Sequence, residues 1–205
     1  MRNIISVFEI ALIIVLPLIL FYQRNKISAR VYIIHIILLY LIWYLTYALL
    51  HELSHMLAVW LLGLKINDYQ LIPRFWKGDF GTGYISTSYE NSVQEFITDI
   101  APYFKDFILL IIGFIILKRV KISNSFIRGL ITILLILSPV FDIFNNYFAY
   151  FLGYQNDFKG MANLAGQTGS HLIGSLLTIF GIIVAVYIFL LEKFDKEQIY
   201  TKLLE

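Results

Sequence analysis

The sequence predicts an all-α polytopic membrane protein with about five transmembrane helices and one small β-hairpin. Of its 205 residues, 59% are hydrophobic and only 15% are charged, whereas soluble domains are about a quarter charged. The mean hydropathy is +0.76, and several apolar segments approach the roughly 20 residues that cross a bilayer. There is no cysteine for disulfides or thiolate metal sites, and no basic cluster of the nucleic-acid type. We therefore expect the lipid bilayer, and no nucleic acid, as a partner.

The apolar segments divide the chain into a series of spans. In chain order the candidates are Ile4–Tyr22, Val31–Leu64, Phe96–Leu117, Phe126–Leu152 and His171–Leu191. The first could be a signal peptide, but Glu9 interrupts its apolar part and no small-residue cleavage site follows, so we expect a retained helix. The second would be about 50 Å long as a helix, against about 30 Å of hydrocarbon, so it must tilt, protrude or break.

Residues 65–91 differ in kind from the spans. Their sequence loses the helical period and gains glycines together with β-favouring Tyr, Ile and Thr, most densely in GDFGTGYISTSY at 78–89. This pattern predicts short strands around glycine turns, in the form of a hairpin. An ordinary extramembrane loop is the alternative.

Lysine and arginine are unevenly distributed among the connections. They gather between the first two spans, between the third and fourth, and after the fifth: Arg24, Lys26 and Arg30; Lys118, Arg119, Lys121 and Arg128; Lys193, Lys196 and Lys202. With five spans these groups share one side, which the positive-inside rule makes cytoplasmic. The pattern predicts a multi-pass protein, of the cell membrane, with the hairpin outside.

The pentapeptide HELSH at residues 51–55 lies inside the longest apolar segment. His51 and His55, four residues apart, share one helix face and can point two imidazoles at one ion. Glu52 borders that face and can take a proton from a water at the ion, which is why H-E-x-x-H suits hydrolysis with Zn²⁺. Placing ionisable side chains inside a membrane span costs free energy, so their presence there indicates a functional site. The alternative is a polar cap at a helix end.

A zinc site of this kind needs a third protein ligand, and the remaining histidines fit poorly. His35 lies about 24 Å along the helix from His51, and His171 begins the last span. Asp142 lies about as far from the end of the fourth apolar segment as His55 lies from the end of the second, so both reach a similar depth. Asp142 is therefore the predicted ligand, and three rivals stay open: Asp99, Asp106 and Asp157.

Asparagine and proline residues surround the predicted ligand. Asn145 and Asn146 share the helix face of Asp142 and could donate hydrogen bonds to an oxyanion or to the substrate, or else join helices. Pro139 frees a backbone carbonyl in the same span, and Pro102 is predicted to kink the third span.

From residue 51 to residue 160 the order of parts resembles the site-2 protease family of intramembrane zinc metallopeptidases. The matching stretches are HELSHMLAVWLLGLKINDYQLIP, GDFGTGYISTSY, DIAPYFKD and SPVFD. The resemblance implies a single membrane-embedded metallopeptidase-like domain over 1–205, with its core at 31–160. It also implies His51, His55 and Asp142 as Zn²⁺ ligands and Glu52 as general base. Members of the family usually open their active site toward the cytosol, with the hairpin on that side, whereas the charge pattern here places the hairpin outside. The sequence therefore does not decide which side of the membrane the active site faces.

These observations predict a zinc-dependent endopeptidase that carries out intramembrane proteolysis of membrane-embedded or membrane-tethered proteins. A substrate would unwind and add a strand to the edge of the 78–89 hairpin, because backbone pairing exposes a peptide bond that a helix hides. The alternative is a non-hydrolytic metal- or proton-binding membrane protein, of the transporter or immunity type, that uses the same HELSH residues.

Overall fold

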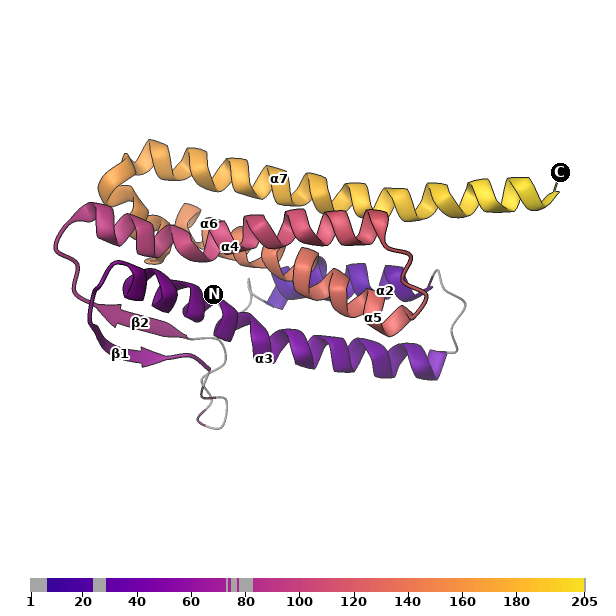
Figure 1. Cartoon of the computed structure of the whole chain (residues 1–205), viewed down its shortest axis with the longest axis horizontal. Coiled ribbons are helices and arrows are strands. Elements are labelled where there is room, and N and C mark those ends of the chain that lie inside the picture. Colours follow the sequence, from indigo (N-terminus) through magenta and orange to yellow (C-terminus); the bar gives the residue numbers. More distant parts are fainter. Residues whose placement is uncertain (1–6, 24–28, 73, 75–76, 78–82, 205) are drawn as a thin grey trace.

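The computed structural model describes residues 7–23, 29–72, 74, 77 and 83–204, with side chains from 7–20, 30–72, 74, 77 and 83–189. Its elements in chain order are η1 (Ile10–Val15), α2 (Leu16–Gln23), α3 (Ala29–Leu61), β1 (Ile66–Gln70), β2 (Tyr84–Thr87), α4 (Ser92–Arg119), α5 (Ser125–Thr132), η3 (Ile133–Leu137), α6 (Ser138–Phe151) and α7 (Asp157–Leu204). The helices run back and forth as a bundle, and the two strands lie at one end of it (Figure 1).

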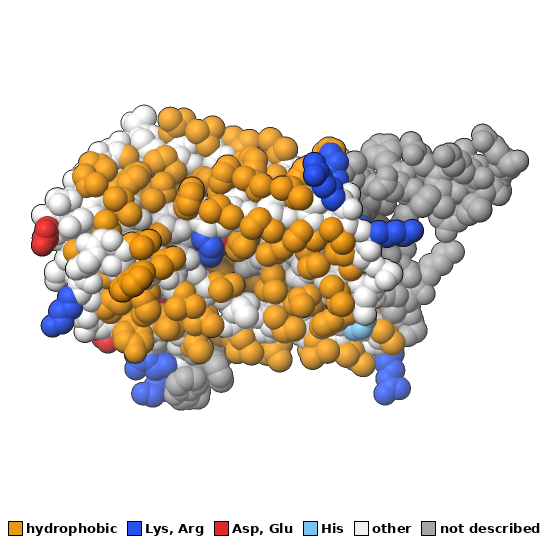
Figure 2. Space-filling view, in the orientation of Figure 1, with side chains coloured by type: hydrophobic (Ala, Val, Ile, Leu, Met, Phe, Trp, Pro, Cys, Tyr) orange, Lys and Arg blue, Asp and Glu red, His pale blue; other side chains and the backbone are white. Residues whose placement is uncertain are grey.

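The helices have the length and composition expected of a membrane protein. In the described residues four helical stretches are long and apolar enough to span a bilayer: Arg30–Leu61, Ser92–Arg119, Ser125–Phe151 and Asp157–Phe189. Apolar side chains cover most of the face seen in Figure 2, as lipid contact requires. The apolar helix Val7–Leu20 is shorter, so the fifth span remains a prediction.

The long second segment forms one continuous helix, α3, so it tilts or protrudes rather than breaking. A glycine ends it. The Gly63 N–H bonds the Trp60 carbonyl, the Leu64 N–H bonds the Val59 carbonyl, and Gly63 has φ of 69°. This is the Schellman arrangement, in which glycine adopts the left-handed conformation without steric cost. The turn sends the chain directly into β1.

Strands β1 and β2 pair antiparallel as a two-stranded sheet, with Tyr69 opposite Ile85 and Gln70 opposite Tyr84. The Tyr84 hydroxyl donates to the Asp68 carboxylate at 2.7 Å, and this bond lowers the pKa of Asp68. The predicted 65–91 insertion thus contains strands, while residues 78–82 of the predicted 78–89 hairpin lie outside the described residues. The hairpin lies at the opposite end of the bundle from the α4–α5 connection and its basic residues (Figure 1).

The third long span, α5–η3–α6, is the most buried of the four. In its most apolar window 56% of residues are buried, against 17–28% in the other three. Phe141 packs edge-on against Trp43 of α3, with ring centroids 5.1 Å apart. The π-helical turn η3 lies directly before Pro139, which has no N–H for the helical ladder. This packing carries Asp142 against α3.

A sharp reversal joins α6 to α7. Gly153 has φ of 84°, its N–H bonds the Tyr150 carbonyl, and the Tyr154 N–H bonds the Ala149 carbonyl, which again forms a Schellman end. Within α7, Gly166 has φ of 72° and separates a short first part from the long span. The reversal returns the start of α7, at Asp157, into the bundle.

Candidate metal centre

The HELSH residues form one wall of a buried polar site on α3. His51 and His55 are 8% and 7% exposed, and their Nε2 atoms lie 3.2 Å apart. The i, i+4 spacing therefore aims both imidazoles at one point, as the sequence predicts.

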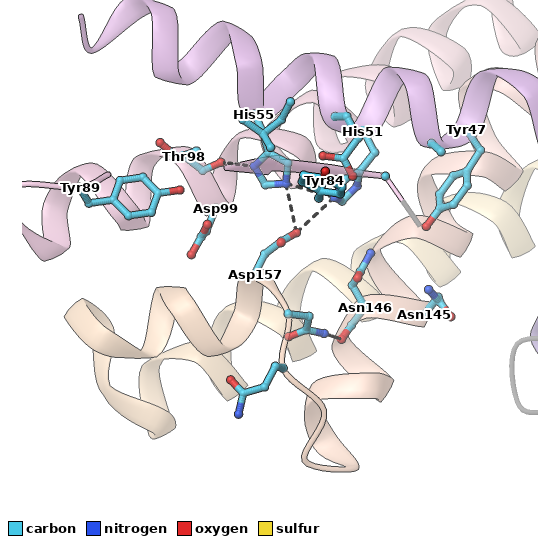
Figure 3. A pocket seen from close by; sticks show the side chains of 16 residues that line it. Tyr47, His51, His55, Tyr84, Tyr89, Thr98, Asp99, Asn145, Asn146 and Asp157 are labelled. Carbon is cyan, nitrogen blue, oxygen red and sulfur yellow. Dashed lines mark hydrogen bonds and ion pairs between the residues drawn. The ribbon is translucent and has the colours of Figure 1, made fainter. Parts of the chain in front are cut away.

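The third group at this point is Asp157, from the start of α7. Its Oδ2 lies 3.2 Å from Nε2 of His51 and 3.5 Å from Nε2 of His55 (Figure 3). In a tetrahedral zinc site with bonds of about 2.0–2.1 Å, neighbouring ligand atoms lie about 3.3 Å apart. These three atoms already have that spacing, so the group could hold a metal ion.

The outer hydrogen bonds fix where the histidine protons lie. Nδ1 of His55 lies 2.8 Å from the Thr98 carbonyl, which can only accept, so Nδ1 carries the proton. Nδ1 of His51 lies 2.9 and 2.8 Å from the two Asp142 oxygens. In the neutral rings both Nε2 atoms then present lone pairs toward the Asp157 carboxylate. Three converging acceptors repel one another unless a proton or a metal cation lies between them, and this is the chemical reason that the residues fit a metal.

Asp142, the predicted third ligand, is beside the site in another position. Both of its carboxylate oxygens bind Nδ1 of His51, away from the point where the Nε2 atoms converge. The depth argument placed Asp142 level with His55, and in the structure its carboxylate meets His51. Depth along a span does not decide which imidazole, or which edge of it, a carboxylate meets. Asp157, one of the rivals left open by the sequence, is the carboxylate that joins the two histidines.

A polar network encloses Asp142. The Lys105 ammonium lies 3.6 Å from its Oδ2 and 3.0 Å from Oδ1 of Asp106, and the Tyr47 hydroxyl lies 3.4 Å from its Oδ1. Asp142 and Asp106 are each 1% exposed, and a buried carboxylate needs such partners. The network can therefore keep Asp142 in place as an acceptor for His51.

The two asparagines on the face of Asp142 have different surroundings. The Asn146 amide donates to the Asp142 backbone carbonyl at 3.1 Å and to its Oδ1 at 2.9 Å. Both amide hydrogens of Asn146 are therefore donated to Asp142 and are not available to an oxyanion. Both asparagines line the cavity described next, and Asn145 is the one left to offer a substrate contact.

A cavity of about 350 Å³ opens onto the three converging atoms. Glu52 lines it and is 7% exposed, and the backbone before β2 passes close to this side chain. A Cβ at Gly83 would lie 2.5 Å from Cγ of Glu52, so any other residue there would have to displace the Glu52 side chain. Tyr84 and Ile85 of β2 also line the cavity, as does Tyr89, whose pKa burial raises to about 12. The HELSH helix and the hairpin thus share one polar chamber.

The other candidate residues lie in different surroundings. His35 packs edge-on against Phe126 at 5.2 Å, and His171 packs against Tyr150 at 4.8 Å, so neither joins the metal group. The two rival aspartates on α4 have different surroundings. Asp99 lines the cavity, whereas Asp106 pairs with Lys105.

Two contributors were missed by the sequence reasoning. The Tyr103 hydroxyl donates to Oδ2 of Asp157 at 2.7 Å, and the Thr98 carbonyl accepts from His55. Both belong to α4, which supplies no ligand to the group. A tyrosine in an apolar helix and a backbone carbonyl carry no signal of such a role, except that Thr98 stands four residues before Pro102.

Comparison with protein-family models, curated proteins and solved structures gave no match. The protein is accordingly described by its own fold and site: a helical protein with four spans long and apolar enough for a membrane among its described residues, and a His–His–Asp group that could hold a metal ion.

Proposed function

We propose that the protein is a zinc-dependent intramembrane endopeptidase that hydrolyses peptide bonds of membrane-embedded or membrane-tethered proteins. The observation that carries the proposal is the convergence of Nε2 of His51, Nε2 of His55 and Oδ2 of Asp157 at 3.2–3.5 Å, in a cavity that Glu52 also lines. The resemblance of the HELSH–hairpin order to site-2 proteases points the same way.

The ligands in this proposal are His51, His55 and Asp157, with Asp142 holding His51 from its far edge. A bound zinc ion would polarise the scissile carbonyl and lower the pKa of a water to about 7. Glu52 takes the proton from the attacking water and returns it to the leaving amine nitrogen. The Asn145 amide lines the same cavity and is the proposed donor to the developing oxyanion.

Substrate would reach the site in extended form. Among the described residues β2 pairs with β1 alone, so its other edge has free backbone groups. Tyr84 and Ile85 of this strand line the cavity, so a chain added to the free edge would pass beside Glu52.

The test is Glu52→Gln, with Glu90→Gln as control because Glu90 is exposed just before α4. Both variants and the unaltered protein are purified in detergent, assayed for bound zinc and placed in liposomes with fluorogenic transmembrane peptides. Glu52→Gln should retain zinc and lose about 10²–10⁴-fold in cleavage rate, while Glu90→Gln should cleave normally.

Two outcomes would contradict the proposal. Undiminished cleavage by Glu52→Gln would show that Glu52 is not the general base. Zinc binding without cleavage of any membrane peptide by the unaltered protein would favour the non-hydrolytic alternative.

A further inference from the structure

Helix α4 contributes no ligand, yet its residues contact His55 and Asp157 directly and reach His51 through Asp142. The Thr98 carbonyl meets His55 and the Tyr103 hydroxyl meets Asp157. Lys105 meets Asp142, which in turn holds His51. These contacts come from residues 98–105 of α4, and Pro102 lies in the middle of this stretch.

Inside an α-helix a backbone carbonyl ordinarily accepts the N–H of the residue four positions later. For Thr98 that residue is Pro102, which lies inside α4 and has no N–H. The Thr98 carbonyl thereby lacks its helical donor, and Thr98 and Pro102 are both buried away from water. A buried carbonyl without a donor is costly, and the Nδ1–H of His55 satisfies this one at 2.8 Å.

The bond to Thr98 decides the chemistry of His55. A neutral imidazole carries one proton, so a proton held at Nδ1 leaves Nε2 as an acceptor. That Nε2 is the atom that lies 3.2 Å from Nε2 of His51 and 3.5 Å from Oδ2 of Asp157. An N–H at residue 102 would compete with the ring for this carbonyl and so weaken the bond that fixes the tautomer and the orientation of His55.

We propose that Pro102 is a positioning residue for the metal centre, which acts by freeing the Thr98 carbonyl to hold His55 in its metal-binding tautomer. The proposal rests on the metal site of the proposed function but not on peptide hydrolysis. This role differs from that of a proline that only kinks a helix, because a kink alone would not affect which nitrogen of His55 carries the proton.

The experiment replaces Pro102 by alanine, which restores the N–H and favours the helix. Pro17→Ala is the matched control, because Pro17 lies in α2, another apolar helix, and does not line the cavity. Zinc affinity is measured by competition with a chelating indicator in detergent, and unfolding of the metal-free protein is followed by circular dichroism. Imidazole ¹⁵N shifts of the metal-free protein, assigned with His55→Gln, report the His55 tautomer.

The zinc dissociation constant of Pro102→Ala should rise about 10- to 100-fold, the usual effect of losing an outer hydrogen bond to a ligand. The metal-free variant should unfold at the same or a higher temperature, whereas damage to folding would lower it. His55 should carry its proton at Nδ1 in the unaltered protein and shift toward Nε2 in the variant. Pro17→Ala should leave affinity and tautomer unchanged.

Three results would overturn the inference: equal zinc affinity of Pro102→Ala and the unaltered protein, an unchanged His55 tautomer in the variant, or an Nε2–H tautomer in the unaltered protein. The last can be measured even if the variant does not fold. A protein that binds zinc and shows these effects but cleaves nothing would support the role of Pro102 and contradict the peptidase.

Discussion

The sharpest prediction concerns the two carboxylates that approach His51 from opposite edges. Asp157→Asn replaces the charged oxygen that lies 3.2 and 3.5 Å from the two Nε2 atoms by a neutral amide of nearly the same shape. Asp142→Asn alters a group that lies 2.8 Å from Nδ1 of the same ring. The first change removes one of the three proposed ligands, and the second removes an outer partner of His51.

The expected magnitudes follow from these positions. Loss of an outer partner costs about 10- to 100-fold in metal affinity, or about 1.4–2.8 kcal/mol, which we expect for Asp142→Asn. Asp157→Asn should lose more than 100-fold, because two histidines alone leave the tetrahedral site half formed. Asp68→Asn, which changes a carboxylate of the hairpin, is the control and should bind zinc normally.

The assay is zinc competition against a chelating indicator with each purified variant, supported by circular dichroism to show that the helices persist. The order of effects is the decisive readout. If Asp142→Asn abolished binding while Asp157→Asn kept it, Asp142 would be the ligand and the arrangement derived from the structure would be wrong.

Two further predictions concern glycines at close approaches. In Gly83→Ala the new methyl group would lie 2.5 Å from Cγ of Glu52, so cleavage should fall at least tenfold at unchanged zinc content; normal cleavage would show that Glu52 need not hold its place. In Gly113→Ala the methyl group would lie 2.7 Å from Cβ of Leu135, and overpacking should cost about 1–3 kcal/mol of unfolding free energy, measured by denaturant titration. Gly181→Ala, whose nearest contact would be 3.3 Å, should cost less, and equal losses would contradict the packing argument.

Much of the fold follows from periodic features of the chain. Four of the expected spans coincide with helices long and apolar enough to cross a bilayer, because a backbone in lipid must satisfy its hydrogen bonds within the segment. The glycine and β-branched composition after the second span matches the strands at 66–70 and 84–87. The length of the second segment leaves open whether it tilts, protrudes or breaks, and the structure shows one continuous helix.

The chain by itself determined the two histidines and the adjacent glutamate of the candidate site, because i, i+4 geometry is a local property of any helix. It also predicted a similar depth for Asp142 and His55, since depth in a span can be counted along the sequence. Tertiary structure alone decided that Asp157 meets the Nε2 atoms and that the Thr98 carbonyl accepts a hydrogen bond from Nδ1 of His55. Those contacts depend on the reversal at Gly153 and on the way α4 packs beside α3, and residues this far apart in sequence meet only through packing, which no local pattern encodes.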